Sequence, residues 1–206
     1  MGDTFTESLP VDWLAPVLEP MVASPHQWLI LTKRPKRMAE FFSNHEVPSN
    51  FWLGTSVTSE ANVSRVEELV KIRGANVLFI SAEPLLGEVS LASWLPQLRW
   101  VITGGESLAG SRPSNPDWFR KLRDECVTAN VPFFFKQWGD FAPLSQVPAT
   151  DLVTKRVLRE LPMLAFPPRQ EEETEQIVYR IGNDAAGGQL DGREWRQMPR
   201  LGAGTA

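Results

Sequence analysis

The chain has 206 residues, of which 42% are hydrophobic and 22% charged, and its formal net charge at pH 7 is −4. This composition is typical of a folded globular protein, and the negative charge argues against a whole-molecule attraction to nucleic acid or to an anionic membrane. The lone cysteine, Cys126, excludes an intrachain disulfide, and His26 and His45 lack a metal-ligand spacing, so we expect no metal site. We also expect no membrane span and a cytoplasmic location.

Five short apolar runs recur along the first two thirds of the chain, and their starts lie 23, 26, 23 and 32 residues apart. They are Trp28–Leu31, Phe51–Leu53, Val77–Ile80, Trp100–Ile102 and Pro132–Phe135. Such intervals are typical of βα units, and nearly continuous hydrophobicity favours strands covered on both faces. The pattern predicts an α/β fold whose parallel sheet is an incomplete TIM-like barrel of about five βα units.

Helical patterns lie between and before these runs. Leu9–Ala23 is a candidate helix interrupted by prolines, Ser59–Arg73 has apolar residues at steps of three and four, and Leu91–Leu95 is long enough for a single turn. Pro116–Ala129 follows an asparagine cap, with proline at its first position. Cys126 falls on the apolar face of that segment, which predicts a buried packing residue and not a nucleophile.

The alternation of strand-like and helix-like segments stops towards the carboxyl end. Residues 140–175 carry several prolines and an acidic run, which indicate a surface excursion or linker. Ile177–Ile181 is a candidate strand, and the glycine-rich stretch that follows suggests a tight turn or a loop whose backbone closely approaches a ligand. We therefore expect a partial barrel domain over residues 1–143 and an irregular tail or small subdomain over residues 144–206.

Polar groups follow every apolar run. The exits read Thr32-Lys33-Arg34, Gly54-Thr55-Ser56, Ser81-Ala82-Glu83, Thr103-Gly104-Gly105-Glu106 and Lys136-Gln137-Trp138. Because the carboxyl ends of parallel strands meet at one edge, where α/β proteins build their sites, we expect these groups to converge. The predicted binding residues are Thr32, Lys33, Arg34, Thr55, Ser56, Gly104, Gly105, Lys136 and Gln137.

The charged residues of these exits allow two interpretations. Glu83 and Glu106 are candidates for acid/base catalysis, with Lys33 or Lys136 as an electrostatic stabiliser. A structural ion network is the alternative, because charges that leave buried strands are costly unless they are paired. In that case Glu83 pairs with Lys136, or Glu106 with Lys33.

Two further features bear on ligands. Residues 33–37 hold four cations, a pattern that suits capture of a phosphate or carboxylate by Lys33 and Arg34 but also a solvated helix start. In the first case Arg34 should matter much more than Arg37. The chain also has eight tryptophans, which favour core packing over a base-stacking surface, since Trp28, Trp52 and Trp100 open apolar runs.

At the same exits the sequence resembles a known family. The segments WLILTKRP, FWLGTSV, FISAEPLLG, WVITGGES, RPSNPDWFRKLRDEC and VPFFFKQWG are similar to the phage gene-product thirty-seven/sixty-eight family, a family of unknown function in phages, prophages and bacteria. The resemblance covers about residues 1–143 and continues over residues 181–199. It implies a TIM-barrel-like fold related to radical-SAM proteins.

The chain differs from that family at its amino end. The resemblance implies that full-length members begin with a strand and a CxxxxxxCxxC loop suited to an iron–sulfur cluster, used with S-adenosylmethionine. In those members a second strand follows and ends in a segment like Met1–Phe5 of this chain, so we expect a truncated barrel without cluster or cofactor. Its first sheet edge, at Trp28, would be exposed, and we expect self-association or cover by residues 9–23.

Three functions remain open from the sequence. The first is a barrel mouth that binds a small, anionic ligand without redox catalysis. The second is an acid/base enzyme that uses Glu83 or Glu106. The third is a nucleic-acid-binding or partner-binding module of a mobile element, which would use the cations of residues 33–37.

Overall fold

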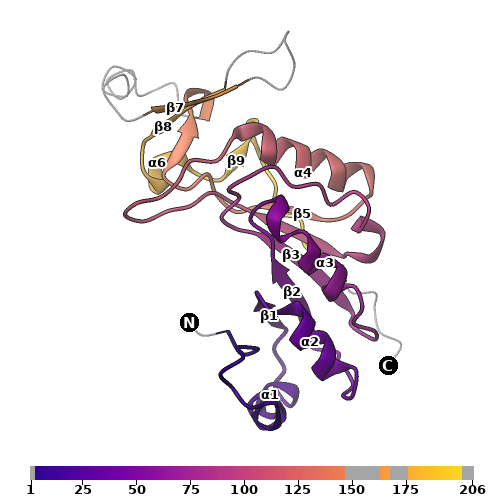
Figure 1. Cartoon of the computed structure of the whole chain (residues 1–206). Helices are drawn as coiled ribbons and strands as arrows, with labels where there is room; N and C mark the ends of the chain where they lie inside the picture. Colours follow the sequence, from indigo (N-terminus) through magenta and orange to yellow (C-terminus); the bar gives the residue numbers. More distant parts are fainter. Residues whose placement is uncertain (1–2, 147–162, 168–175, 201–206) are drawn as a thin grey trace.

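The computed structural model describes residues 3–146, 163–167 and 176–200, and its centre is an all-parallel sheet of five strands in the order β1-β2-β3-β4-β5 (Figure 1). The strands are β1 (Trp28–Thr32), β2 (Phe51–Ser56), β3 (Val77–Ala82), β4 (Trp100–Thr103) and β5 (Phe133–Phe135). The predicted α/β fold is confirmed, with every predicted strand present. The described strands form an open sheet, consistent with a partial TIM-like fold.

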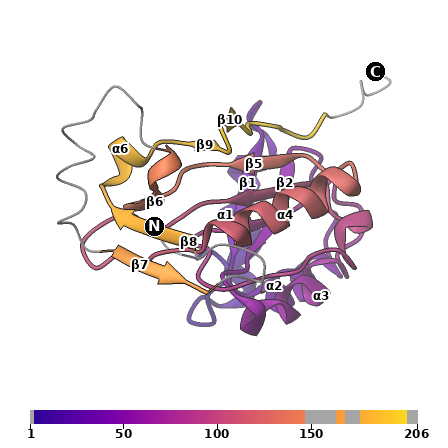
Figure 2. The ribbon, with the colours of Figure 1, turned by 90° about the horizontal axis from the view of Figure 1, so that it is seen from above.

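Helices cover one face of this sheet. They are η1 (Val11–Trp13), α1 (Leu14–Val22), α2 (Pro35–Phe42), η2 (Glu60–Asn62), α3 (Ser64–Leu69), η3 (Leu95–Gln97) and α4 (Pro116–Thr128). Figures 1 and 2 show α2, α3 and α4 on the same side of the strands. None of the helices in the described ranges is long and apolar enough to cross a membrane.

Local sequence explains where these helices begin and end. The Asn115 side chain accepts a hydrogen bond from the Asp117 backbone N–H at 3.0 Å, so α4 starts as predicted and ends at Thr128. Cys126 is fully buried on the inner face of α4, as predicted. The expected helix over Ser59–Arg73 is instead the short η2 followed by α3, which ends at Leu69.

The sheet buries side chains on both faces. All six residues of β2 and of β3 are buried. Phe51, Leu53 and Ile80 belong to the main core under the helices, whereas Trp52, Val77, Phe79 and Trp100 form a separate cluster on the other face. The prediction of core tryptophans is therefore confirmed for Trp52 and Trp100, while Trp13 of η1 is 61% exposed.

The carboxyl-terminal part has its own small sheet, in the order β6-β8-β7 and antiparallel throughout. Its elements and those that follow are β6 (Phe141–Pro143), η4 (Leu144–Gln146), β7 (Met163–Phe166), β8 (Gln176–Arg180), α6 (Asn183–Ala186), β9 (Gln189–Leu190) and β10 (Arg193–Glu194). The strand expected near residues 177–181 is confirmed. Within residues 140–175, expected to be a surface excursion or linker, the structure forms the strands β6 and β7, and β7 is largely exposed. Residues 147–162 and 168–175 lie outside the described part.

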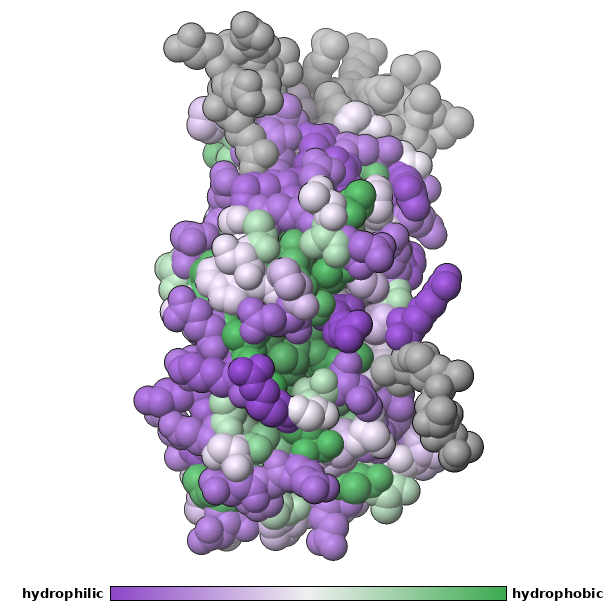
Figure 3. Space-filling model, turned by 90° about the vertical axis from the view of Figure 1, so that its right-hand side faces the viewer, coloured by the Kyte–Doolittle hydropathy of each residue, from purple (hydrophilic) through white to green (hydrophobic). Residues whose placement is uncertain are grey.

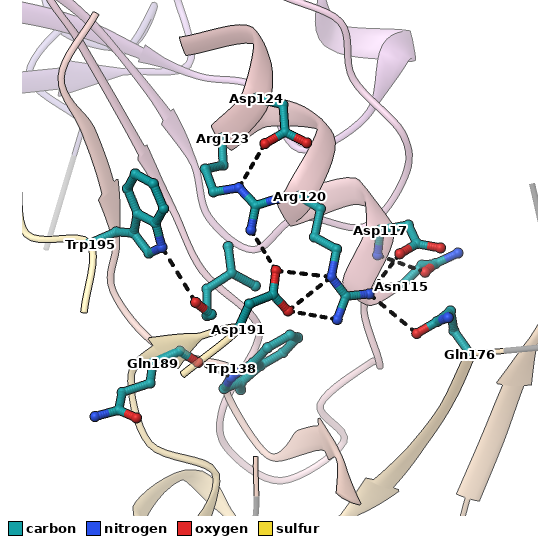
Figure 4. A network of polar contacts seen from close by, with 11 residues as sticks. Asn115, Asp117, Arg120, Arg123, Asp124, Trp138, Gln176, Gln189, Asp191 and Trp195 are labelled. Atoms are coloured by element: carbon teal, nitrogen blue, oxygen red, sulfur yellow. Dashed lines mark hydrogen bonds and ion pairs between the residues drawn. The ribbon is translucent and has the colours of Figure 1, made fainter. Parts of the chain in front are cut away.

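Residues 195–197 lie beside the free edge of β5. The backbone N–H of Phe135 donates to the Trp195 carbonyl at 2.8 Å, and Phe134 pairs with Arg196 in an antiparallel bridge. Just before this stretch, the Asp191 carboxylate lies between Arg120 and Arg123 of α4 (Figure 4). These contacts bind the tail to the sheet edge and to α4 at the same time.

The two ends of the strands form different surfaces. Where the strands begin, a cleft of about 830 Å³ lies between the loops before β3, β4 and β5 and the tail residues Pro199 and Arg200. Figure 3 looks at the molecule from the right of Figure 1 and shows apolar side chains along the middle of that face, between hydrophilic ones. The polar exits predicted from the sequence lie at the opposite ends of the strands.

Candidate functional site

The carboxyl ends of all five strands meet at one edge of the sheet. The register pairs Thr32 with Thr55, Ser56 with Ser81, and Thr103 with both Ala82 and Phe135. The exits that follow are therefore neighbours in space, in the same order as the strands. This brings the predicted site residues to a single edge; their roles in binding or catalysis remain predictions.

The threonines at this edge tie neighbouring strands together. The Thr55 hydroxyl donates to the Thr32 carbonyl at 2.8 Å, and the Thr103 hydroxyl donates to the Ala82 carbonyl at 3.1 Å. Both side chains are fully buried. The hydroxyl protons of both residues are therefore donated to backbone carbonyls of the neighbouring strand. Thr55, which we predicted to bind a ligand, joins the ends of β1 and β2.

Glu83 and Lys136 form one of the two ion pairs considered from the sequence, with 3.5 Å between Glu83 Oε2 and Lys136 Nζ. The other carboxylate oxygen, Glu83 Oε1, is buried and has no hydrogen-bond partner among the described residues. A Cβ at Gly104 would lie 3.3 Å from that oxygen, so the glycine leaves room beside it. Burial raises the pKa of Glu83, and the nearby Lys136 ammonium offsets this only in part.

Glu106 is held by a different partner from the one considered. Its carboxylate accepts hydrogen bonds from Arg112 Nε at 2.8 Å, Arg112 Nη2 at 2.7 Å and the Arg112 backbone N–H at 2.8 Å. These contacts lower the pKa of Glu106 to about 2. The pairing of Glu106 with Lys33 is therefore wrong, and a carboxylate with so low a pKa is a weak base that is poorly suited to accept a proton near neutral pH.

Two glycines let the loops after β4 and β5 touch. The Gly105 backbone N–H donates to the Gln137 carbonyl at 2.9 Å, and a Cβ at Gly105 would lie only 1.7 Å from the Trp138 carbonyl oxygen. Gly139, at φ +80°, approaches from the other side, where its Cβ would lie 2.2 Å from the Glu106 carbonyl oxygen. The space that the sequence suggested for a ligand at Gly105 is thus filled by the protein's own backbone.

Asp3 is a residue of this edge that the sequence argument did not single out. Its carboxylate accepts hydrogen bonds from the Thr32 hydroxyl at 2.7 Å, the Lys33 backbone N–H at 3.0 Å and Arg34 Nη1 at 3.1 Å. Burial alone would raise the pKa of Asp3, but these hydrogen bonds outweigh it and lower the pKa. The only signal was its place in the family-like opening segment, because its partners lie about 30 residues away.

A cleft of about 570 Å³ opens beside Asp3, between the first turns of α2 and α3. Its lining carries five cations and three carboxylates, namely Lys33, Arg34, Lys36, Arg37 and Arg65 against Glu7, Glu40 and Glu68. Lys33 and Lys36 are exposed, whereas Arg37 is half-buried and donates to the Leu9 carbonyl. Arg37 is therefore a structural contact and not the plain surface cation expected. We call this hollow the basic cleft.

The described residues do not match the metal chemistry that the family resemblance implies. No three of their His, Cys, Asp or Glu side chains gather as ligands for an ion. Cys126, the one cysteine of the sequence, is buried in α4, where burial raises the pKa of its thiol to about 12. One buried thiol does not fit the three thiolates that such a cluster loop would supply.

Comparison with known proteins identifies one family. The family described as "Protein of unknown function (DUF5131)" matches residues 1–199. No curated protein and no solved structure matches the chain significantly.

Proposed function

The chain belongs to the DUF5131 family of proteins of unknown function, and from this premise we propose that it binds a small anionic ligand in the basic cleft. The single observation that carries the proposal is the cleft's lining, in which five cations face three carboxylates at the carboxyl edge of a parallel sheet. Concave sites at this edge are where α/β proteins bind ligands. A concave, positively charged lining concentrates anions more than a flat surface does.

The cleft offers three kinds of donor to one anion. Lys33 and Lys36 supply exposed ammonium groups. Arg34 contributes a guanidinium that Asp3 orients through a single 3.1 Å contact, which leaves its other N–H groups for a ligand. The first turn of α2 begins with Pro35, and the partial positive charge of its N-terminus adds to the attraction. A phosphate or a carboxylate satisfies all three.

Replacing Lys33 and Lys36 together with glutamine should weaken the binding of inorganic phosphate by about tenfold or more, since a charge-assisted hydrogen bond contributes about 1.5–3 kcal/mol. Isothermal titration calorimetry measures the change. Both side chains are exposed and make no hydrogen bond or ion pair with the described residues, so the variant should unfold at the same temperature as the wild type.

The matched control is Arg73→Gln, which removes an exposed cation of the loop after α3 that does not line the basic cleft. Phosphate affinity should be unchanged in this control. If the double variant also binds phosphate as tightly as the wild type, the basic cleft is not the anion site. If a DNA duplex binds better than phosphate and its affinity falls steeply with salt, the nucleic-acid alternative gains support.

A second candidate function, acid/base chemistry at Glu83, has a specific observation in its favour. A half-buried carboxyl group with one buried, unpartnered oxygen and a raised pKa is the kind of group that takes part in proton transfer. Lys136, at 3.5 Å, would stabilise the charged form. Glu83 follows β3, so it lies at the same carboxyl edge of the sheet as the basic cleft.

The Lys136→Met variant should raise the pKa of Glu83 further, because it removes the ammonium that lowers this pKa while burial remains. Carbon-13 NMR of the Glu83 carboxyl measures it directly. A raised pKa means that the native state holds its proton to higher pH than the unfolded chain, so stability falls as the pH rises from about 4.5 through the folded pKa. Glu83→Gln should abolish that fall. An unchanged pKa in Lys136→Met would refute the coupling of the two groups.

The finer features of the family resemblance enter the proposal only in part. We propose a phage or prophage origin and a radical-SAM-like ancestry from the family resemblance alone; the open, TIM-like sheet is compatible with the ancestry and bears no relation to the origin. Since one buried thiol does not fit a cluster, the proposal assigns this chain ligand binding and no radical step.

A further inference from the structure

A second cleft, of about 410 Å³, lies at the opposite end of α2 from the basic cleft. One wall is the side of α1 that carries Leu18 and Val22, and Phe41, Phe42 and Phe51 lie at the floor. Each phenylalanine is at most 8% exposed, so only a small part of each one reaches the cleft. We call this hollow the aromatic cleft. Its size falls in the range of roughly 300–1,000 Å³ found for small-molecule sites.

The charged groups around the aromatic cleft have a single sign. Glu19 of α1 and Glu46 of the loop after α2 line it, and no lysine or arginine does. Both carboxylates are exposed. His45 also lines the cleft, and its ring is stacked on Phe41 with ring centroids 4.1 Å apart and an angle of 10° between the planes. Its Nδ1 lies 2.9 Å from the Phe41 carbonyl oxygen, which fixes the ring against the wall.

We propose that the aromatic cleft binds a small organic cation, of the alkylammonium or arylammonium class. Aromatic faces attract a cation through their quadrupoles, and quaternary ammonium groups are the ligands that such walls recognise best. The apolar floor would take the hydrocarbon part of the ligand out of water. Glu19 and Glu46 would face its positive charge from the rim and repel an anion of the same shape. This site is independent of the anion site in the basic cleft.

The test uses the full chain and proton–carbon NMR of its histidine rings. The sequence holds only two histidines, His26 and His45, so their signals are readily distinguished. Phenyltrimethylammonium should shift the His45 signals in a saturable way and leave those of His26 in place. Benzoate, an anion of similar size, should leave both in place at the same concentrations.

Three variants sharpen the result. Glu19→Gln combined with Glu46→Gln should weaken phenyltrimethylammonium binding by about tenfold, because both rim charges are lost. Ala15→Phe, at an exposed lining position of α1, should fill the cleft and abolish the shifts. Glu60→Gln, at an exposed carboxylate of η2 outside the cleft lining, is the matched control and should bind as the wild type does.

Several results would overturn the proposal. Equal shifts with benzoate and phenyltrimethylammonium would mean that the cleft does not discriminate charge. Unchanged affinity in Ala15→Phe would place the binding elsewhere. Broadening of the His45 signals that grows with protein concentration in the absence of the probe would identify a second copy of the chain as the occupant, and not an organic cation.

Discussion

Gly105→Ala should lower the free energy of unfolding by about 3 kcal/mol or more, at the upper end of what overpacking costs. The new Cβ would lie 1.7 Å from the Trp138 carbonyl oxygen and 2.5 Å from its carbonyl carbon, so the backbone itself has to move. Trp138 cannot yield easily, because its side chain is buried and its indole N–H donates to the Gln189 carbonyl at 2.7 Å. Urea denaturation followed by tryptophan fluorescence measures the loss.

The control for Gly105→Ala is Gly74→Ala, where no atom lies within 4 Å of the new Cβ but φ is +78°. It should cost only about 1 kcal/mol, from backbone strain alone. Gly139→Ala probes the same loop contact from the other side and should be as damaging as Gly105→Ala. A wild-type urea midpoint for Gly105→Ala would show that the loops after β4 and β5 do not touch as described.

The central sheet was predictable because its strands carry their own signal. β2 and β3 are buried on both faces, so they appear in the sequence as unbroken apolar runs at regular intervals. β6 and β7 carry no such signal. They are short, lie in a proline-rich stretch and depend on antiparallel pairing with β8, from which β6 is separated by β7 and the residues around it. Pairing between distant segments is set by tertiary structure and not by local periodicity.

The sequence allowed us to predict which edge of the sheet holds the candidate site. It was less informative about the partner that each side chain has there. Strand polarity alone placed Glu83 and Lys136 together, and they pair. The partners of Glu106 and Arg34 were missed, since Arg112 belongs to an irregular loop and Asp3 to the opening segment. Loop conformation decides such pairs, and the sequence offers no periodic pattern from which to read it.

Asp191→Asn should be the most damaging change in the carboxyl-terminal tail, with a loss of about 2 kcal/mol. The carboxylate accepts from Arg120 Nε at 3.0 Å and from Arg120 Nη2 at 2.8 Å, and it also contacts Arg123 (Figure 4). Its removal leaves two arginine side chains without their shared counter-charge. Because the Asp191 side chain is 36% exposed, solvent screening keeps the loss below that of a fully buried pair.

Asparagine is the appropriate replacement because Asp191 has φ +53°, a conformation that asparagine tolerates well. The backbone of the β9–β10 turn should therefore survive, and the loss of the charge is isolated. Glu68→Gln is the control, since it breaks an exposed ion pair with Lys71 on α3, away from the tail, and should change stability by no more than about 0.5 kcal/mol.

The effect of Asp191→Asn should also depend on pH and should reach the edge of the central sheet. Burial would raise the pKa of Asp191, but the hydrogen bonds from Arg120 and Arg123 outweigh it and lower the pKa. The stabilisation is therefore fully present above about 3.8 and is lost as the pH falls through the lower folded pKa, so wild type and variant should converge in acid. At neutral pH the Phe135 amide, which donates to Trp195, should exchange its hydrogen faster in the variant. Unchanged exchange at Phe135 would mean that the tail stays paired with β5 without the ion pairs between Asp191 and the two arginines.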